Sequence, residues 1–424
     1  MSITAFAQAR GIFYGWWVVT ATAIIVFLTG GTFFYGFSAL FNPVEEEFGW
    51  SRASVAFAFS LRSEVGGLAA PVMGLMVDRV GSRRLMMSGV VIVAIGFVLM
   101  SQTSSLVTFY GSVIVIAIGM SATAGPVGMV AIAHWFHRRR GRALSFMTAG
   151  AGTSGVMVLV LELLISSFGW RDALIIMAVT QLVVCFPLAM TVRNRPDEIG
   201  LQPDGDPAPT REESLETVGA RPFQAEGLTL GQAMRTRAFW QLSFAVMLTN
   251  IGMITVIVHQ IPFFTKSIGL SEGLAAGSVT AMTLISLTGR FGMGQLADVI
   301  DKRFVLATSF GLCALALLLF ATIYEPWQII YALPVFAIGW GGIIPVRPAF
   351  QADYFGMKAF GAIQGIVFTV ATLGGFIGPV FAGWMYDQTD SYRLAFVILS
   401  AGALLAVPLT LTMSRPDWNL ANPD

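Results

Sequence analysis

Long apolar stretches, separated by short polar ones, run through almost the whole chain of 424 residues. Twelve of them have the length of a helix that crosses the ~30 Å hydrocarbon core of a bilayer. We place these spans at residues 16–38, 54–77, 85–102, 106–134, 142–167, 172–192, 238–264, 273–297, 303–323, 328–352, 358–384 and 392–413. The pattern predicts an all-α integral membrane protein with twelve transmembrane helices.

Composition places the chain in the same class. Hydrophobic residues make up 55% of the sequence and charged residues 12%, whereas a soluble domain carries roughly 25% charged residues. A net charge of +1, with no basic run interleaved with aromatic residues, excludes a nucleic-acid-binding protein. Cys185 and Cys313 lie in apolar spans of different halves, so we expect no disulfide, no metal site and no cofactor.

One long polar segment divides the spans into two sets of six. Residues 193–237 are rich in Pro, Glu, Asp and Thr and cannot bury enough apolar surface to fold alone. We therefore predict an N-terminal half at 1–192, a cytoplasmic linker at 193–237 and a C-terminal half at 238–424. Within the linker, residues 228–235 (LTLGQAMR) predict a short interfacial helix.

Loop charges predict the orientation. Basic residues fill one set of short loops, as in HRRRGR at 137–142, while Glu45, Glu46 and Glu47 occupy the other set. By the positive-inside rule, the basic loops, the linker and both termini are cytoplasmic. The expected location is the cell (inner) membrane, with multiple passes.

Three motifs recur between the halves at an offset near 220 residues. The recurring pairs are Gly74 with Gly294, Asp78 with Asp298, Pro126 with Pro345, and Arg171 with Arg393. Motifs in one order at one offset indicate parallel structural repeats that face each other across a central cavity.

The offset also shows where the symmetry is broken. Arg290 corresponds to Ala70 and Arg347 to Gly128, so two intramembrane cations are added to the second half. Arg290 precedes the charged turn at Asp298 by ~12 Å of helix, which places it near mid-membrane, where a guanidinium costs a few kcal/mol or more. Such an arginine marks a substrate path or forms an internal ion pair, and the asymmetry favours a ligand.

The turn after the second span follows the pattern G-x-x-x-D-R-x-G-x-R-R. Its residues are Gly74, Asp78, Arg79, Gly81, Arg83 and Arg84, and a degenerate copy that includes Asp298 follows the eighth span. This turn resembles the signature of the major facilitator superfamily, and the resemblance covers about residues 12–414. It implies two six-helix repeats that rock about a central site. It also implies a cytoplasmic gate formed by Gly74, Asp78, Arg79, Arg83, Arg84 and Asp298. The alternative is that the basic residues of this turn only set the orientation in the membrane, by the positive-inside rule.

Two further segments narrow the resemblance. These are YGWWVV at 14–19 and WFHRRRGRALSFMTAGAGTSG at 135–155. They are similar to the first-span entry and to the fourth loop and fifth span of the monocarboxylate transporter group, which includes the oxalate and formate exchanger. In that group an arginine of the eighth span is thought to hold the substrate carboxylate, and Arg290 falls at its position. A guanidinium suits this role because it offers a bidentate fork to a carboxylate.

Departures from that group concern proton coupling and charge. The aspartate one turn before the arginine in mammalian members is Ser286 here, and the lysine of the first span is Ala39. Glu64, in the second span, is therefore our candidate for a coupled proton. The lysine deep in the eleventh span of the oxalate exchanger is not matched, since Lys358 lies at the start of that helix. A dianionic substrate is less favoured, although Arg347 could supply a second charge.

Four more residues are candidates for the substrate site. Tyr35 would place a phenol donor on the cavity face of the first span, and Trp340 lies among glycines that would expose helix backbone. His259 ends the seventh span, where an imidazole could bond a carboxylate, shuttle a proton or serve in packing. Arg347 lies nearer the cytoplasmic end, as a gate residue or as a ligand.

The predicted function is secondary active transport of a small organic anion, a monocarboxylate, with proton coupling left open. Export of drugs or other hydrophobic compounds is the alternative within transport, and a non-transporting solute sensor is the alternative from another class. An enzyme is excluded because three histidines form no His-Glu pattern, and no nucleophile motif or phosphate-binding glycine loop is present. We expect a monomer in the lipid bilayer.

Overall fold

The computed structural model describes residues 13–123, 125–206 and 227–418. Within these ranges each of the twelve predicted spans lies in helix, and no strand is present. The predicted all-α class is therefore confirmed. Part of the predicted linker, residues 207–226, lies outside the described residues. At its end, α12 (Leu230–Met234) confirms the short predicted helix.

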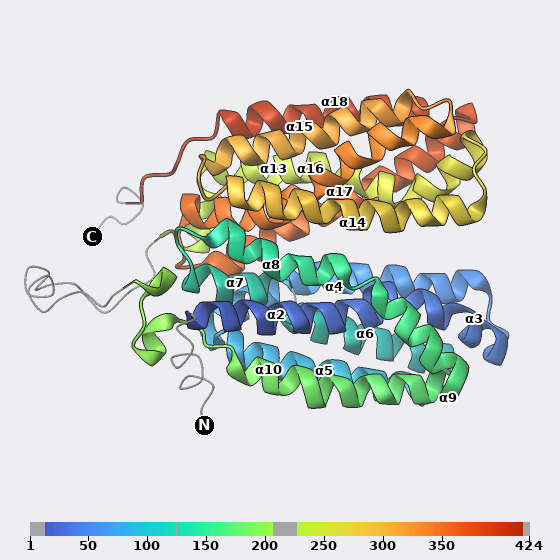
Figure 1. Cartoon of the computed structure of the whole chain (residues 1–424), viewed down its shortest axis with the longest axis horizontal. Coiled ribbons are helices and arrows are strands. Elements are labelled where there is room, and N and C mark those ends of the chain that lie inside the picture. The colour runs from blue at the N-terminus through green and yellow to red at the C-terminus, as the bar shows by residue number, and fades with distance from the viewer. Residues whose placement is uncertain (1–12, 124, 207–226, 419–424) are drawn as a thin grey trace, which may run out of the picture. The chain divides into compact units, whose positions relative to one another are not determined.

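Contacts divide the helices into two compact units, which Figure 1 draws in ribbon form. The first unit comprises Met1–Thr229 and Gly356–Gly365, and the second comprises Leu230–Phe355 and Ile366–Asp424. The first contains α2 (Tyr14–Gly30), α3 (Phe37–Phe48), α4 (Arg52–Val80), α5 (Ser82–Ser101), α6 (Leu106–Thr123), α7 (Pro126–Trp135), α8 (Arg140–Thr153), α9 (Val156–Thr180) and α10 (Phe186–Thr191). The second contains α12, α13 (Arg237–Pro262), α14 (Glu272–Leu296), α15 (Lys302–Ala321), α16 (Ile329–Phe355), most of α17 (Phe360–Thr389) and α18 (Arg393–Leu411).

Short irregular turns extend several of these helices. Those with π-helical hydrogen bonding are Gly31–Tyr35, Gln181–Cys185 and Phe263–Ser267, which continue α2, α9 and α13. Turns of 3-10 helix occur at Pro196–Ile199, Pro203–Gly205 and Pro326–Gln328.

Nine helical stretches in the described ranges are long and apolar enough to cross a membrane. One of them, Arg140–Thr191, has 52 residues, which is ~78 Å of straight helix and more than twice the thickness of a hydrocarbon core. Gly169 interrupts this stretch with a φ of 81°, so it supplies two spans. The helices α4 and α14, with 29 and 25 residues, complete the twelve predicted spans, and both carry charged side chains.

Equivalent helices begin or end at the offset that the sequence motifs predict. The pairs are the starts of α5 at Ser82 and α15 at Lys302, the ends of α7 at Trp135 and α16 at Phe355, and the ends of α10 at Thr191 and α18 at Leu411. Packing repeats as well, because α5 contacts α6 and α9 as α15 contacts α16 and α18. The predicted pair of six-helix repeats is therefore confirmed.

The same local signals start equivalent helices in the two repeats. Gly49 and Gly269 adopt left-handed conformations with φ of 62° and 77°, which glycine tolerates because it has no Cβ. Two residues later, Ser51 and Ser271 cap α4 and α14 by accepting a hydrogen bond from the backbone N–H three positions on. Such a cap satisfies one of the N–H groups that a helix start leaves without a partner.

Arg171 and Arg393, one of the repeated pairs, hold equivalent carbonyl groups. The Nη2 of Arg171 donates to Thr103 O at 2.9 Å, and the Nη2 of Arg393 donates to Ile323 O at 3.2 Å. Both carbonyls lie two residues beyond a helix end, where backbone acceptors need outside partners. Arg171 also pairs with Glu47 at 2.7 Å, and its hydrogen bond holds the pKa of that carboxyl below the usual value.

Each unit has an apolar core rich in phenylalanine. Buried core residues of the first unit include Phe33, Phe97, Phe109 and Trp170, and those of the second include Phe263, Phe264, Phe320, Phe336 and Phe396. The cores fix the helices that carry the candidate site residues.

Glycines bring α14 and α16 into backbone contact. A Cβ on Gly289 would lie 2.2 Å from Ile338 O, and one on Gly341 would lie 2.1 Å from Ser286 O. Atoms cannot approach this closely, so neither position accepts a side chain. Inside a membrane, small residues at a helix crossing are the usual means of such close packing. The crossing sets the distance between the side chains that flank it.

We predict that Gly341→Ala destabilises the protein by about 1–3 kcal/mol, the usual cost of overpacking, because the added methyl group overlaps Ser286 O. Gly292→Ala, on α14, is the matched control because nothing lies within 4 Å of its Cβ position. The control should be neutral or stabilising, since alanine is the better helix former. Thermal unfolding of the purified variants in detergent measures both effects, and equal midpoints would contradict the tight crossing.

Candidate functional site

Arg290 lies in α14 beside the glycine crossing, with 2% of its surface exposed. Its guanidinium carbon is 5.7 Å from the centroid of the Trp340 ring on α16. The face of an indole attracts a cation at this distance by about 0.5–2 kcal/mol. Trp340 in turn stacks on Phe336, with ring centroids 6.4 Å apart. The indole therefore forms one wall of the arginine site, held in place by a core side chain.

The residue one turn before Arg290 cannot neutralise it by ionising. Ser286 is fully buried, and its hydroxyl donates to Thr283 O at 2.6 Å within the same helix. An aspartate at this position would form a permanent ion pair across one helical turn. With serine there, the positive charge of Arg290 is not cancelled from that position.

Arg347 lies on α16, seven residues beyond Trp340, which is ~10 Å along the helix axis. Its side chain is half-buried, and its Nε is buried without a hydrogen-bond partner among the described residues. A buried donor left unsatisfied costs about 1–3 kcal/mol. Arg290, Trp340 and Arg347 thus lie together on the packed pair α14 and α16, and two of the three carry positive charge.

His259 has protein partners at both ring nitrogens. Its Nε2 lies 3.0 Å from Pro379 O, and its Nδ1 lies 3.3 Å from the hydroxyl of Tyr392. Because a carbonyl only accepts, Nε2 must carry the proton, and Nδ1 accepts from the phenol. A phenol is protonated at neutral pH, so the hydroxyl of Tyr392 can donate to Nδ1. These contacts favour the packing role for His259 over substrate binding.

Tyr35 and Glu64 are described only through their backbone. Tyr35 ends the π-helical turn Gly31–Tyr35, and Glu64 lies within α4. Their side chains lie outside what the structure describes. Single π-helical turns are frequent at functional sites, which agrees with the placement of Tyr35 but does not test it. Both residues stay predictions.

Arg62, on α4, is a buried cation to which sequence analysis assigned no role. It is 4% exposed, its Nη1 donates to Phe33 O at 2.9 Å, and its guanidinium carbon lies 5.8 Å from the Phe33 ring. Phe33 belongs to the same π-helical turn as Tyr35, so Arg62 ties that turn to α4. The first half therefore also contains a buried cation, at a position that matches neither Arg290 nor Arg347.

Asp78, near the end of α4, binds the first turn of α17 within the first unit. Its Oδ1 and Oδ2 accept hydrogen bonds from the backbone N–H groups of Gly361 at 3.0 Å and Ala362 at 2.9 Å. A carboxylate at a helix start satisfies N–H groups that have no partner in the helix and complements the helix dipole. The carboxylate of Asp78 thus caps the N-terminus of α17.

Gly74 makes room for this contact. A Cβ on Gly74 would lie 2.0 Å from Gly361 O, and one on Gly361 would lie 2.4 Å from the Cγ1 of Val77. The two backbones therefore touch, and a side chain at either glycine would push α17 away from Asp78. Gly74 allows the close approach of α4 and the first turn of α17.

The other gate candidates have different surroundings. Arg79 and Arg84 are exposed and Arg83 is half-buried, and none of the three forms an ion pair with Asp78 in the described part of the chain. Asp298 lies half-buried in the turn after α14. A gate role for these four residues stays a prediction.

Comparison with known proteins identifies relatives along the whole chain. The family profile of the Major Facilitator Superfamily matches residues 21–343 and 261–422. The chain is 25% identical to the oxalate:formate antiporter of Oxalobacter formigenes, over 96% of this chain and 95% of that protein. It is 26% identical to human monocarboxylate transporter 11, over 92% and 81%, and 24% identical to monocarboxylate transporter 13 of Bos taurus, over 95% and 91%.

Solved structures show the same fold. The human organic anion transporter MFSD10 (TETRAN) matches with a TM-score of 0.71 at 14% identity, over 93% of this chain and 99% of that one. The E. coli fucose:proton symporter FucP matches with a TM-score of 0.66 at 14% identity, over 94% and 98%. These similarities agree with the helices and the internal repeat described above, and they show that the fold is shared.

We predict that Asp78→Ala exposes the start of α17, because the amides of Gly361 and Ala362 lose their only side-chain acceptor among the described residues. Two charge-assisted hydrogen bonds of about 1.5 kcal/mol each correspond to roughly a 100-fold faster exchange of these amides, measured by hydrogen–deuterium exchange. Asp78→Asn should show a smaller effect. Asp197→Asn, an exposed control, should show none, and unchanged exchange in Asp78→Ala would rule out the cap.

Proposed function

The chain belongs to the major facilitator superfamily, and on that basis we propose that it is a secondary active transporter of a small organic anion, specifically a monocarboxylate. The anion binds at Arg290, and the two halves rock so that the site opens to one side of the membrane at a time. The observation that supports this proposal best is a buried guanidinium with an indole wall and no ionisable residue one turn before it.

The energetics favour a bound anion at Arg290. A central intramembrane arginine costs at least ~2.5–3.5 kcal/mol. A carboxylate held by two charge-assisted hydrogen bonds returns about 1.5–3 kcal/mol for each bond. Burial strengthens such bonds because little water competes for them. A bidentate carboxylate therefore offsets a large part of the cost of burying Arg290, which favours anion binding there.

A single carboxylate fits the arrangement better than two. Arg347 lies ~10 Å beyond Trp340 along α16, whereas the two carboxylates of oxalate are directly bonded to each other. We therefore assign Arg347 to the path that the anion follows, and Tyr35 to a hydroxyl donor at the site. The name of monocarboxylate transporter 11 supports this class of substrate, and the name of the oxalate:formate antiporter includes one monocarboxylate, formate, beside the dicarboxylate oxalate. His259 is left to packing.

We propose that the cap of Asp78 on α17 is part of a cytoplasmic gate that opens during each transport cycle. Gly74 permits the contact, and Arg79, Arg83, Arg84 and Asp298 complete the gate. The basic loops favour a cell (inner) membrane orientation with the linker and both termini in the cytoplasm. The protein acts as a monomer in this proposal.

We predict that Arg290→Gln abolishes anion binding while folding stays intact. Acetate, lactate and pyruvate, as part of a screen of short mono-, di- and keto-acids, should raise the unfolding temperature of the wild-type protein by mass action. The glutamine variant loses two charge-assisted bonds, which is at least about 100-fold in affinity. Arg290→Lys should recover only part of the effect, because an ammonium lacks the planar fork.

Arg237→Gln is the matched control, because Arg237 is exposed at the start of α13 in the same unit. It should respond to the acids as the wild type does. Equal stabilisation of Arg290→Gln by an acid would return Arg290 to a structural role. Stabilisation by hydrophobic cations in place of acids would favour drug export, and binding without uptake into vesicles would favour a sensor.

We further propose that Glu64 carries a coupled proton, because Ser286 replaces the aspartate of the resembling group. We predict that Glu64→Gln loses pH-driven uptake into vesicles but keeps exchange of labelled anion, since the amide cannot release a proton. Glu162→Gln, which removes a carboxyl from α9, is the control and should keep both activities. Full pH-driven uptake in Glu64→Gln would remove Glu64 from the mechanism.

A further inference from the structure

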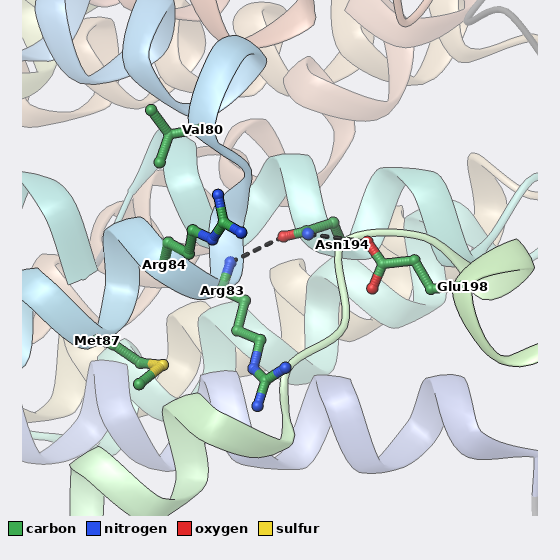
Figure 2. Close-up of a pocket in the computed structure, with 6 residues that line it drawn as sticks. All are labelled: Val80, Arg83, Arg84, Met87, Asn194 and Glu198. Carbon is green, nitrogen blue, oxygen red and sulfur yellow. Dashed lines mark hydrogen bonds between the residues drawn. The ribbon is translucent and has the colours of Figure 1, made fainter.

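A pocket of ≈ 520 Å³ lies in the first unit where α4 gives way to α5. Figure 2 shows its lining residues, which are Val80, Arg83, Arg84, Met87, Asn194 and Glu198. The side chain of Asn194 holds the wall together, because its Oδ1 accepts from the backbone N–H of Arg83 at 2.9 Å and its Nδ2 donates to Glu198 at 2.8 Å. Asn194 thus links the start of α5 to the segment that follows α10, and the pocket lies between them.

The two arginines of the pocket have no ion-pair partner in the part of the chain that the structure describes. The Nε of Arg83 is buried without a hydrogen-bond partner there. The exposed Arg138 and the half-buried Arg171, in contrast, each pair with a carboxylate. Two guanidinium groups and the carboxylate of Glu198 leave the lining with a net charge of +1, which matches the single charge of a phosphodiester.

The position of Arg84 decides between a lipid and a soluble anion. Arg84 and Ser88 are exposed, and the exposed face of α5 continues through Ile95 and Leu99, which are 50% and 45% exposed. These positions recur at helical spacing, so they form one stripe that faces the acyl chains. The 20 residues of α5 span ~30 Å, the thickness of the hydrocarbon core. Arg84, in the first turn, therefore lies at the level of the lipid headgroups.

We propose that this pocket binds the phosphodiester headgroup of an anionic phospholipid. Arg83 and Arg84 donate to the phosphate oxygens, Val80 and Met87 contact the glycerol and the start of the acyl chains, and the chains lie along the exposed stripe of α5. Basic pockets at the membrane surface are a recognised means of binding such headgroups. Arg83 and Arg84 then anchor a lipid beside the turn that also carries Asp78.

The test measures the unfolding temperature of the purified full chain in detergent as short-chain phosphatidylglycerol is added. The lipid should stabilise the protein by mass action, and short-chain phosphatidylcholine and inorganic phosphate should have much smaller effects. The double substitution Arg83→Gln and Arg84→Gln should weaken binding of phosphatidylglycerol at least about tenfold, through the loss of charge-assisted hydrogen bonds. Arg139→Gln, which removes an exposed charge outside the pocket, should bind as the wild type does.

A second variant, Glu198→Gln, should change the affinity for the lipid in the opposite direction. It tests the proposal even if the double variant does not fold. Removing this negative charge should tighten the binding of an anionic lipid. Weaker binding in Glu198→Gln would instead indicate a zwitterionic headgroup whose ammonium pairs with Glu198, and would overturn the proposal. If inorganic phosphate stabilised the protein as much as phosphatidylglycerol does, the site would be one for a soluble anion. If Arg139→Gln weakened lipid binding as much as the double variant does, the attraction would be non-specific. Either result would also overturn it.

Discussion

Burying one guanidinium in a membrane-spanning helix is the constraint on which the second half of this protein depends. Arg290 is almost fully enclosed, and a charge in that position is tolerated only where the surroundings compensate it. The glycine contact of α14 with α16 brings the Trp340 indole within cation–π distance. The remaining compensation must come from polar groups or an anion. The tight crossing therefore supports the proposed anion site, since a bulkier residue at Gly341 would move the indole away from the arginine.

Comparison of the two repeats distinguishes residues that stabilise the fold from residues that are candidates for function. Arg171 and Arg393 hold equivalent carbonyls, and Ser51 and Ser271 cap equivalent helices. Interactions that appear in both repeats stabilise the architecture in both. The buried cations do not repeat, because Arg290 and Arg62 occupy different positions of their repeats. Arg62 donates to the backbone of a π-helical turn, and Arg290 lies over an indole.

Much of the fold could be predicted from the sequence because its signals are local. Apolar length gave the twelve spans, and motif spacing gave the repeat. The start of α14 follows from Gly269 and Ser271, which need no tertiary information. The partners of individual side chains could not be predicted in the same way. Nothing local to His259 shows that both its nitrogens are occupied by residues more than a hundred positions away, and nothing near Asp78 points to Gly361.

The two polar contacts central to the proposed mechanism differ in how easily water can replace them. Asp78 is exposed at the end of α4, so when its hydrogen bonds to α17 break, water satisfies both partners, and each bond contributes a net of only about 0.5–3 kcal/mol. Contacts of this strength can form and break in every cycle. A hydrogen bond in an apolar medium is worth about 4–6 kcal/mol, and at Arg290 no bulk water is available to replace it. A reversible gate therefore belongs at the membrane surface, while the buried arginine must exchange one anionic partner for another or be hydrated as its ligand leaves.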